Sequence, residues 1–273
     1  MEILEGKSVA EKIKSGFEER ISKLNKKPYF AVLGIYGDDA SAVYVKRIQK
    51  NCEKYGIKFL LKMANDEEEF RANFEEIKNN SNITGIMFQQ PLPKQCLELI
   101  NEIPSYKDIE GLSTENMGKL ILGKEDAIIP CTSKAVMETL DYYNIDLTGK
   151  KVVIVGRSNI VGKPLIPQVL AKNATVTICH SKTKNIDDEL RQADVIIMAI
   201  GKAKFLKKEQ IKQGAILIDV GINFEDDKIV GDIDFEDVKE KASKCTPVPG
   251  GVGTVTNALL IDNIIKSVDN KPY

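Results

Sequence analysis

The chain has 273 residues, with 39 lysines and arginines, 40 aspartates and glutamates, one histidine and five cysteines, and 42% of its residues are hydrophobic. This composition is typical of a globular protein with room for two domains, which excludes a disordered chain and a small disulfide-stabilised scaffold. The net charge of −1 gives no field that would attract nucleic acid or a membrane, so we predict neither as a partner.

The N-terminal residues 1–7 carry acids where a secretory signal carries bases, and no stretch approaches the roughly 20 apolar residues of a membrane span. We therefore expect a cytoplasmic protein. The cysteines are far apart and odd in number, which favours buried thiols over a disulfide framework. His180 is the single histidine, so we predict no metal site and expect the chemistry to rest on other groups.

The first half of the chain alternates between helical and strand patterns. In chain order, apolar spacing and turn residues predict a helix over 8–24, a strand over 29–36, a helix over 40–55 ended by Gly56, a strand over 57–62, a helix from Asp66 and a strand over 85–88. Strands that alternate with helices indicate an α/β unit with a mostly parallel sheet.

A second α/β unit follows a predicted helix near 133–143 and a turn at 146–149. Its strands are predicted over 151–155, 175–179, 195–200 and 215–220, with glycines at their ends. A helical pattern over 257–268 closes the chain, and its periodicity does not tell on which unit it packs. The predicted fold class is therefore α/β with two domains.

A glycine-containing loop, Gly156–Gly162, connects the strand over 151–155 to a helix with Pro164 near its start. A phosphate group binds at such a place through backbone N–H groups and the helix dipole. Ser158 and Val161 stand where the dinucleotide fingerprint has its second and third glycines, so a plain turn between strand and helix is the alternative.

The residues after the strand over 175–179 indicate which dinucleotide binds. An NAD site has an acidic residue about 20 positions beyond the loop, but this chain has His180-Ser-Lys-Thr183 there. With Arg157 beside the first glycine, these residues suit a 2′-phosphate, and we predict NADP as the cofactor. His180 could bind that phosphate, although a lone histidine beside a strand end is more often structural.

Nine short segments, in a fixed order along nearly the whole chain, together resemble the motifs of one known protein family. They are Ile3–Ala10, Ser41–Val45, Gln89–Pro93, Lys107–Gly111, Pro130–Thr132, Gly156–Gly162, His180–Thr183, Ile218–Asn223 and Thr246–Gly253. Each alone is weak, but together the sequence resembles the methylenetetrahydrofolate dehydrogenase/methenyltetrahydrofolate cyclohydrolase family of one-carbon metabolism.

The resemblance implies how the domains are arranged. It implies a folate-binding catalytic domain over 1–120 and a Rossmann-type NADP-binding domain over 121–253, with the C-terminal helix in 254–273 packing back on the first domain. It further implies that folate binds in the cleft between the domains. The family also leads us to expect a homodimer formed through the nucleotide domain.

The resemblance also implies roles for individual residues. Tyr44 should pack against the folate ring system and Gln89 should hydrogen-bond near the reacting carbon, whereas an ordinary helix-face aromatic is the structural alternative for Tyr44. The remaining substrate-binding residues are Glu110, Pro249, Gly250 and Gly251. The cofactor-binding residues are Gly156, Arg157, Ser158, Gly162, Ser181 and Ile222, with Arg157 and Ser181 on the 2′-phosphate.

One departure from the family affects the chemistry. The family has a lysine one helical turn after the tyrosine, and that lysine is held responsible for proton transfer in the hydrolase step, whereas this chain has Ile48 there. Lys46 and Lys50 lie roughly 200° around the helix from Ile48, so neither can take its place. Arg47 is nearer to the face of Tyr44, but a guanidinium stays protonated and makes a poor base.

A second departure is Glu110, which replaces the family's aspartate at the pterin end of folate with a side chain one methylene longer. Hydride transfer to a nicotinamide mainly needs alignment, but hydrolysis needs a positioned acid or base, and Ile48 supplies neither. We therefore predict NADP-dependent oxidation of 5,10-methylenetetrahydrofolate with cyclohydrolase activity absent or very weak. The alternatives are a bifunctional enzyme in which Glu110 or a water chain replaces the lysine, and a noncatalytic folate- or NADP-binding protein.

Overall fold

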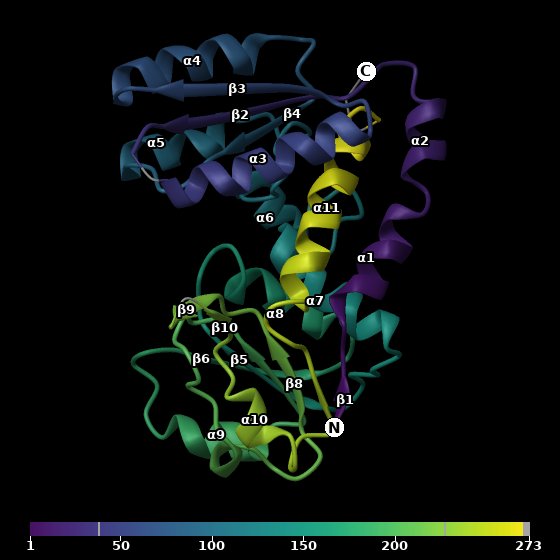
Figure 1. The fold of residues 1–273 in the computed structure, drawn as a ribbon, viewed down its shortest axis with the longest axis vertical. Coiled ribbons are helices and arrows are strands. Elements are labelled where there is room, and N and C mark those ends of the chain that lie inside the picture. Colours follow the sequence, from purple (N-terminus) through teal and green to yellow (C-terminus); the bar gives the residue numbers. More distant parts are fainter. Residues whose placement is uncertain (38, 227, 270–273) are drawn as a thin grey trace. The chain divides into compact units, whose positions relative to one another are not determined.

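The computed structural model describes residues 1–37, 39–226 and 228–269, which form two compact units (Figure 1). The first unit combines 1–12 with 130–256, and the second combines 13–129 with the chain from 257. Each unit is built around its own parallel sheet. The predicted two-domain α/β fold is confirmed.

The first unit contains a six-stranded sheet whose order is β1-β11-β8-β7-β5-β6, with every neighbouring pair parallel. Its central strands are buried runs of valine, isoleucine and leucine, as expected where helices cover both faces. Helices α9 and α10 contribute Leu190 and Val238 to the core on one face. The strands are β1 (Glu2–Ile3), β5 (Lys151–Val155), β6 (Thr175–Cys179), β7 (Val195–Met198), β8 (Ile216–Asp219) and β11 (Lys244–Cys245), beside a hairpin of β9 (Asn223–Glu225) and β10 (Lys228–Val230). The helices are α7 (Cys131–Tyr142), α8 (Gly162–Leu170), α9 (Ile186–Gln192) and α10 (Phe235–Val238), with a 3₁₀ turn η2 (Lys208–Gln210).

The second unit contains a three-stranded parallel sheet of order β3-β2-β4. Helices α3 and α4 lie on opposite sides of it (Figure 1), as two right-handed crossovers in opposite directions require. Phe70 and Phe74 of α4 pack edge-on against Phe88 of β4. The strands are β2 (Tyr29–Ile35), β3 (Lys58–Ala64) and β4 (Gly85–Phe88), and the helices are α2 (Phe17–Lys23), α3 (Asp39–Lys54), α4 (Glu67–Asn79), α5 (Lys94–Glu98), η1 (Leu99–Glu102) and α6 (Thr114–Ile121).

The structure differs from the sequence prediction at the N-terminus. The single helix predicted over 8–24 is two helices, α1 (Gly6–Lys14) and α2, because Gly16 has a non-helical backbone with φ −101° and ψ 3°. Residues 1–12 were expected in the folate domain, but β1 pairs with β11 and so belongs to the sheet of the first unit. A two-residue strand has no period from which the sequence could reveal this pairing.

The predicted domain boundaries after 120 and 253 also differ from those of the compact units. Residues up to 129 stay with the second unit, since Ile128 donates its backbone N–H to Asn116. Helix α11 (Val252–Lys266) belongs to the second unit from residue 257, where Asn263 donates a 2.8 Å hydrogen bond to the carbonyl of Ile109. All five cysteines are buried thiols, as predicted. None of the helices among the described residues has the length and apolar character needed to cross a bilayer.

Candidate active site

The loop between β5 and α8 has the close packing that a dinucleotide loop needs. Gly156 has φ +126°, and a Cβ on it would lie 2.2 Å from the carbonyl oxygen of Ala199. A Cβ on Gly162 would lie 2.0 Å from the carbonyl oxygen of Gly156, so both glycines are required. Ser158, which spoils the sequence fingerprint, accepts a 3.1 Å hydrogen bond from the Val161 N–H and so stabilises the loop with its side chain.

The predicted 2′-phosphate residues lie at the carboxyl ends of two adjacent strands. Val155 of β5 pairs with Cys179 of β6, so Arg157 and Ser181, each two residues further on, follow neighbouring strand ends. Both side chains are exposed. An exposed guanidinium and hydroxyl beside a helix N-terminus fit a phosphorylated dinucleotide.

His180 is held by its own turn. Its Nδ1 accepts a 3.1 Å hydrogen bond from the Lys182 N–H, and its backbone N–H donates to the Thr183 hydroxyl. This geometry favours the structural role for His180 and leaves Ser181 in the exposed part of the turn. Ile222, the remaining predicted cofactor residue, is exposed just after β8.

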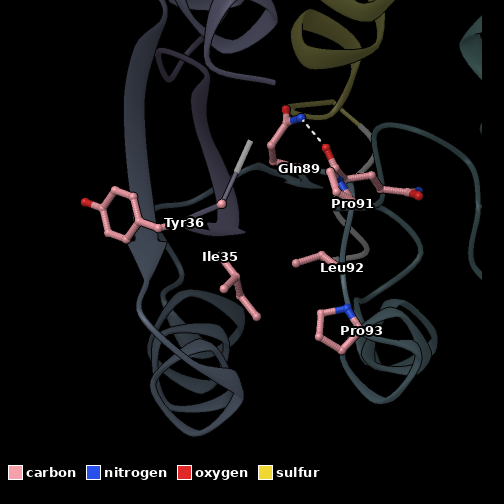
Figure 2. Close-up of a pocket in the computed structure, with 8 residues that line it drawn as sticks. Ile35, Tyr36, Gln89, Pro91, Leu92 and Pro93 are labelled. Carbon is pink, nitrogen blue, oxygen red and sulfur yellow. Dashed lines mark hydrogen bonds between the residues drawn. The ribbon is translucent and has the colours of Figure 1, made fainter. Parts of the chain in front are cut away.

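In the second unit, a pocket of about 300 Å³ opens where β2 and β4 end (Figure 2). Ile35 at the end of β2, Tyr36 and Gly37 after it, and residues 89–93 after β4 line this pocket. Gln89 donates its side-chain amide to the carbonyl of Gln90 at 2.7 Å, shown dashed in Figure 2. Its Oε1 is buried and has no hydrogen-bond partner among the described residues. A ligand with an N–H or O–H group would supply the missing donor.

Glu110 meets the same end of β4. Its carboxylate accepts the backbone N–H of Phe88, next to Gln89 in the chain. Burial, followed by the negative charge of Asp108, raises the pKa of the half-buried Glu110 to about 8, although the Phe88 N–H lowers it. The structure therefore places the Glu110 carboxylate against Phe88, the residue before Gln89, and gives it a pKa close to neutral pH.

Two buried residues that precede Glu110 in the chain, and whose roles the sequence did not reveal, fix the segment that carries it. Lys107 donates to the carbonyls of Lys78 and Asn80 and so stabilises the C-terminal end of α4. Asp108 accepts the backbone N–H groups of Leu112 and Ser113 and the side-chain amide of Asn116. The Lys107–Gly111 motif is thus largely a scaffold, and its charge pattern gave no sign of this.

Helix α3 carries the position of the missing lysine. Ile48 is 2% exposed and lies on a buried stripe with Val45 and Cys52, whereas Tyr44 is 37% exposed and does not line the pocket of Figure 2. Lys46, Arg47 and Lys50 are all exposed. The prediction that neither neighbouring lysine takes the place of Ile48 agrees with this burial pattern.

The segment from Pro249 to Gly251 belongs to the first unit, where it packs against Gly6. Gly6 donates its N–H to the carbonyl of Gly250 at 2.8 Å, and a Cβ on Gly6 would lie 2.0 Å from the Gly251 carbonyl oxygen. Gly250 has φ +102°, and Gly251 is buried. Gly6 has no sequence signal of its own, because its need for close approach is visible only once β1 is placed beside β11.

The fold and the loop together define an α/β protein with a dinucleotide-binding domain. Residues 130–272 match the model of the tetrahydrofolate dehydrogenase/cyclohydrolase NAD(P)-binding domain, and residues 4–110 match that of the catalytic domain of the same family. The chain belongs to the tetrahydrofolate dehydrogenase/cyclohydrolase family, which confirms the resemblance inferred from its motifs.

Similar proteins cover nearly the whole chain. The bifunctional protein FolD of Halalkalibacterium halodurans is 43% identical over 97% of this chain and 98% of its own length. A crystal structure of the bifunctional enzyme FolD from Campylobacter jejuni has a TM-score of 0.94 at 42% identity and 99% coverage of both chains. The Trypanosoma brucei enzyme, solved with NADP cofactor and inhibitor, has a TM-score of 0.90 at 29% identity, covering 98% of this chain and 97% of its own.

Proposed function

We propose that this protein oxidises 5,10-methylenetetrahydrofolate with NADP and also hydrolyses the methenyl product to 10-formyltetrahydrofolate. Relatives that match it from end to end are named bifunctional, so the comparisons favour this alternative over the loss of cyclohydrolase that Ile48 led us to predict. The chain is an enzyme of this family, and the balance between its two reactions is the part that we propose.

The first reaction removes a hydride from the methylene carbon and leaves a methenyl cation. NADP, when bound, supplies the hydride acceptor. The protein's part is alignment: Gln89 offers its unpartnered Oε1 to the substrate, and Tyr44 packs against the folate rings. Arg157 and Ser181 bind the 2′-phosphate and so select NADP over NAD. The positions directly after Cys179, 180–183, hold no carboxylate that would bind the free ribose hydroxyls of NAD. The loop residues Gly156, Ser158 and Gly162 hold the cofactor phosphates, Ile222 contacts the cofactor, and Pro249, Gly250 and Gly251 contact the substrate.

The second reaction is supported by one observation in particular, the position of the Glu110 carboxylate at the end of β4, where it accepts the N–H of Phe88. Water adds to the methenyl carbon and gives up one proton, and the resulting hydroxyl gives up a second as the bond from that carbon to N5 breaks and the formyl C=O forms. N5 takes up one proton, so that one proton is released overall. A group that both accepts and donates a proton near neutral pH meets this need. The carboxyl group of Glu110 has a pKa in that range, and its side chain reaches one methylene further than an aspartate.

A second candidate function, dehydrogenase activity alone, is favoured by Ile48. This side chain is buried and apolar at the position of the family's lysine, and the cations on either side of it are exposed. In that case Glu110 would bind the pterin end of the substrate without taking part in proton transfer.

One pair of assays separates these functions. Formation of NADPH from 5,10-methylenetetrahydrofolate excludes a noncatalytic binding protein. Decay of the methenyl absorbance above its uncatalysed rate supports the bifunctional proposal, and decay at the uncatalysed rate supports dehydrogenase activity alone. Hydrolysis by the unaltered protein should depend on an ionisation near pH 8, and Glu110→Gln should abolish hydrolysis while NADPH formation persists.

We also propose a homodimer that forms through the dinucleotide-binding unit, as the family resemblance implies. Sedimentation of the purified protein across a range of concentrations tests this. A single monomeric species at all concentrations would contradict it.

A further inference from the structure

Two buried aspartates of the first unit take no part in the function proposed above. Asp219, the last residue of β8, is 3% exposed. Its carboxylate accepts backbone N–H groups from Gly221 at 2.9 Å, from Asp232 at 3.0 Å and from Ile233 at 2.8 Å. It therefore fixes the chain that leaves β8 and the chain that returns after the β9–β10 hairpin.

Asp232 is completely buried and fixes a third segment. Its carboxylate accepts backbone N–H groups from Ile200 at 2.7 Å, Gly201 at 3.1 Å and Lys202 at 2.7 Å, and the side-chain amide of Asn223 at 3.0 Å. Burying a carboxylate is costly unless donors surround it, and the three backbone donors come from the loop that follows β7, whereas Asn223 belongs to β9. The two aspartates thus connect the segments after β7 and after β8.

The surrounding glycines show how closely these carboxylates fit. A Cβ on Gly221 would lie 2.1 Å from Oδ1 of Asp232, and a Cβ on Gly231 would lie 2.0 Å from Oδ2 of Asp219. Each backbone segment therefore approaches a carboxylate at a distance that a side chain would prevent. The arrangement leaves each of these segments little freedom to move on its own.

The segment fixed by Asp232 reaches the dinucleotide loop. The peptide that joins Ala199 to Ile200 directs its N–H to Asp232, and its oxygen lies on the opposite side because the peptide is planar and trans. That oxygen is the atom that a Cβ on Gly156 would meet at 2.2 Å. A continuous chain of contacts thus runs from the carboxylate of Asp232 to the first glycine of the loop.

The sheet order indicates which part of the cofactor these segments serve. β7 and β8 lie on one side of β5, and β6 lies on the other. The adenosine end, with its 2′-phosphate, is assigned above to Arg157 and Ser181 at the ends of β5 and β6. A dinucleotide that crosses the carboxyl ends of such a sheet places its nicotinamide half at the ends of β7 and β8.

We propose that Asp219 and Asp232 are positioning residues for the nicotinamide half of the cofactor, because they fix the backbone of 200–202 and 221–223 against which that half binds. They touch neither substrate nor cofactor and act through these two segments. The proposal uses the NADP preference stated under Proposed function only to choose its binding probes.

The test compares two ligands that share one end. Calorimetric titration measures the affinity of the whole protein and of Asp232→Asn for two ligands. One is NADP, and the other is adenosine 2′,5′-bisphosphate, which lacks the nicotinamide half. In Asp232→Asn the side-chain NH2 faces backbone N–H groups, so hydrogen bonds that hold 200–202 are lost. NADP affinity should therefore fall about tenfold or more while bisphosphate affinity stays within about twofold. Asp194→Asn is the matched control, since Asp194 accepts the Lys151 N–H at the opposite ends of the strands and should change neither affinity.

Equal losses for both ligands would show a general structural role and overturn the proposal, as would unchanged NADP affinity. If Asp232→Asn does not fold, Asn223→Ala decides, because it removes one donor to Asp232 and should weaken NADP binding selectively. If the unaltered protein does not bind the bisphosphate, the proposed NADP preference has failed. NAD and adenosine 5′-monophosphate then replace the two probes with the same selective loss expected.

Discussion

From the raised pKa of Glu110 we predict how the free energy of unfolding depends on pH, and this prediction is independent of catalysis. Its pKa is about 8 in the folded protein and 4.5 in its ordinary state, so the folded protein holds a proton that the unfolded chain releases between these values. A carboxyl group with a raised pKa stabilises the fold at low pH, and that contribution is lost as the pH rises toward 8. Glu110→Gln removes the ionisation and should remove this loss.

The size of the effect follows from the same two pKa values. Each pH unit between them changes the free energy of unfolding by about 1.4 kcal/mol, which gives an upper limit of about 5 kcal/mol over the whole interval. Urea unfolding measures this change in the free energy of unfolding. It is carried out at several pH values from about 5 to 8 on the unaltered protein, on Glu110→Gln and on the exposed control Glu125→Gln.

The unaltered protein and Glu125→Gln should lose stability in parallel over this range, and Glu110→Gln should lose less. Burial also raises the pKa of Asp219, to about 7, but Asp219 is present in all three proteins and cancels in the differences. Identical pH slopes for all three would show that Glu110 ionises normally, which would remove the basis of its proposed role in hydrolysis.

Three further predictions concern the dinucleotide loop and helix α3. Arg157→Ala should raise the KM for NADP about tenfold or more with little change for NAD, because a charge-assisted contact contributes roughly 1.5–3 kcal/mol; equal effects on both would exclude a 2′-phosphate role. Gly162→Ala puts a methyl group 2.0 Å from the Gly156 carbonyl oxygen, so it should lower Tm and weaken NADP binding, and unchanged affinity in titration would contradict the packing described. Ile48→Lys should raise the rate of methenyl decay, by at most about 10²–10⁴-fold, if a missing amine limits hydrolysis, and an unchanged rate would show that it does not.

Much of the fold could be predicted because its strongest signals are local. The buried strands β5, β7 and β8 are short runs of mainly apolar residues, β5 followed by Gly156 and β8 ending in Asp219. Asp66 accepts the Glu69 N–H where the helix α4 was predicted to begin. Such features depend on neighbours within a few residues, which the sequence displays directly.

The features that escaped prediction depend on residues far apart in the chain. The pairing of β1 with β11 joins positions about 240 residues apart, and the need for glycine at position 6 follows from it. Asp232 was not singled out, since its donors at 200–202 lie some 30 residues away and no motif links them. The raised pKa of Glu110 likewise depends on burial, which no spacing in the sequence records.

Burial also explains how isoleucine fits at position 48. A lysine at a site that is 2% exposed must either leave its ammonium group desolvated or extend its stem to reach water, and both arrangements carry a cost that an apolar side chain avoids. Isoleucine instead completes the buried stripe of α3 with Val45 and Cys52. Isoleucine at position 48 thus improves the packing but leaves this helix face without the family's titratable lysine. Any hydrolysis must therefore use a group elsewhere. Glu110 meets the end of β4 at Phe88 and ionises close to neutral pH, which is why we propose it for that role.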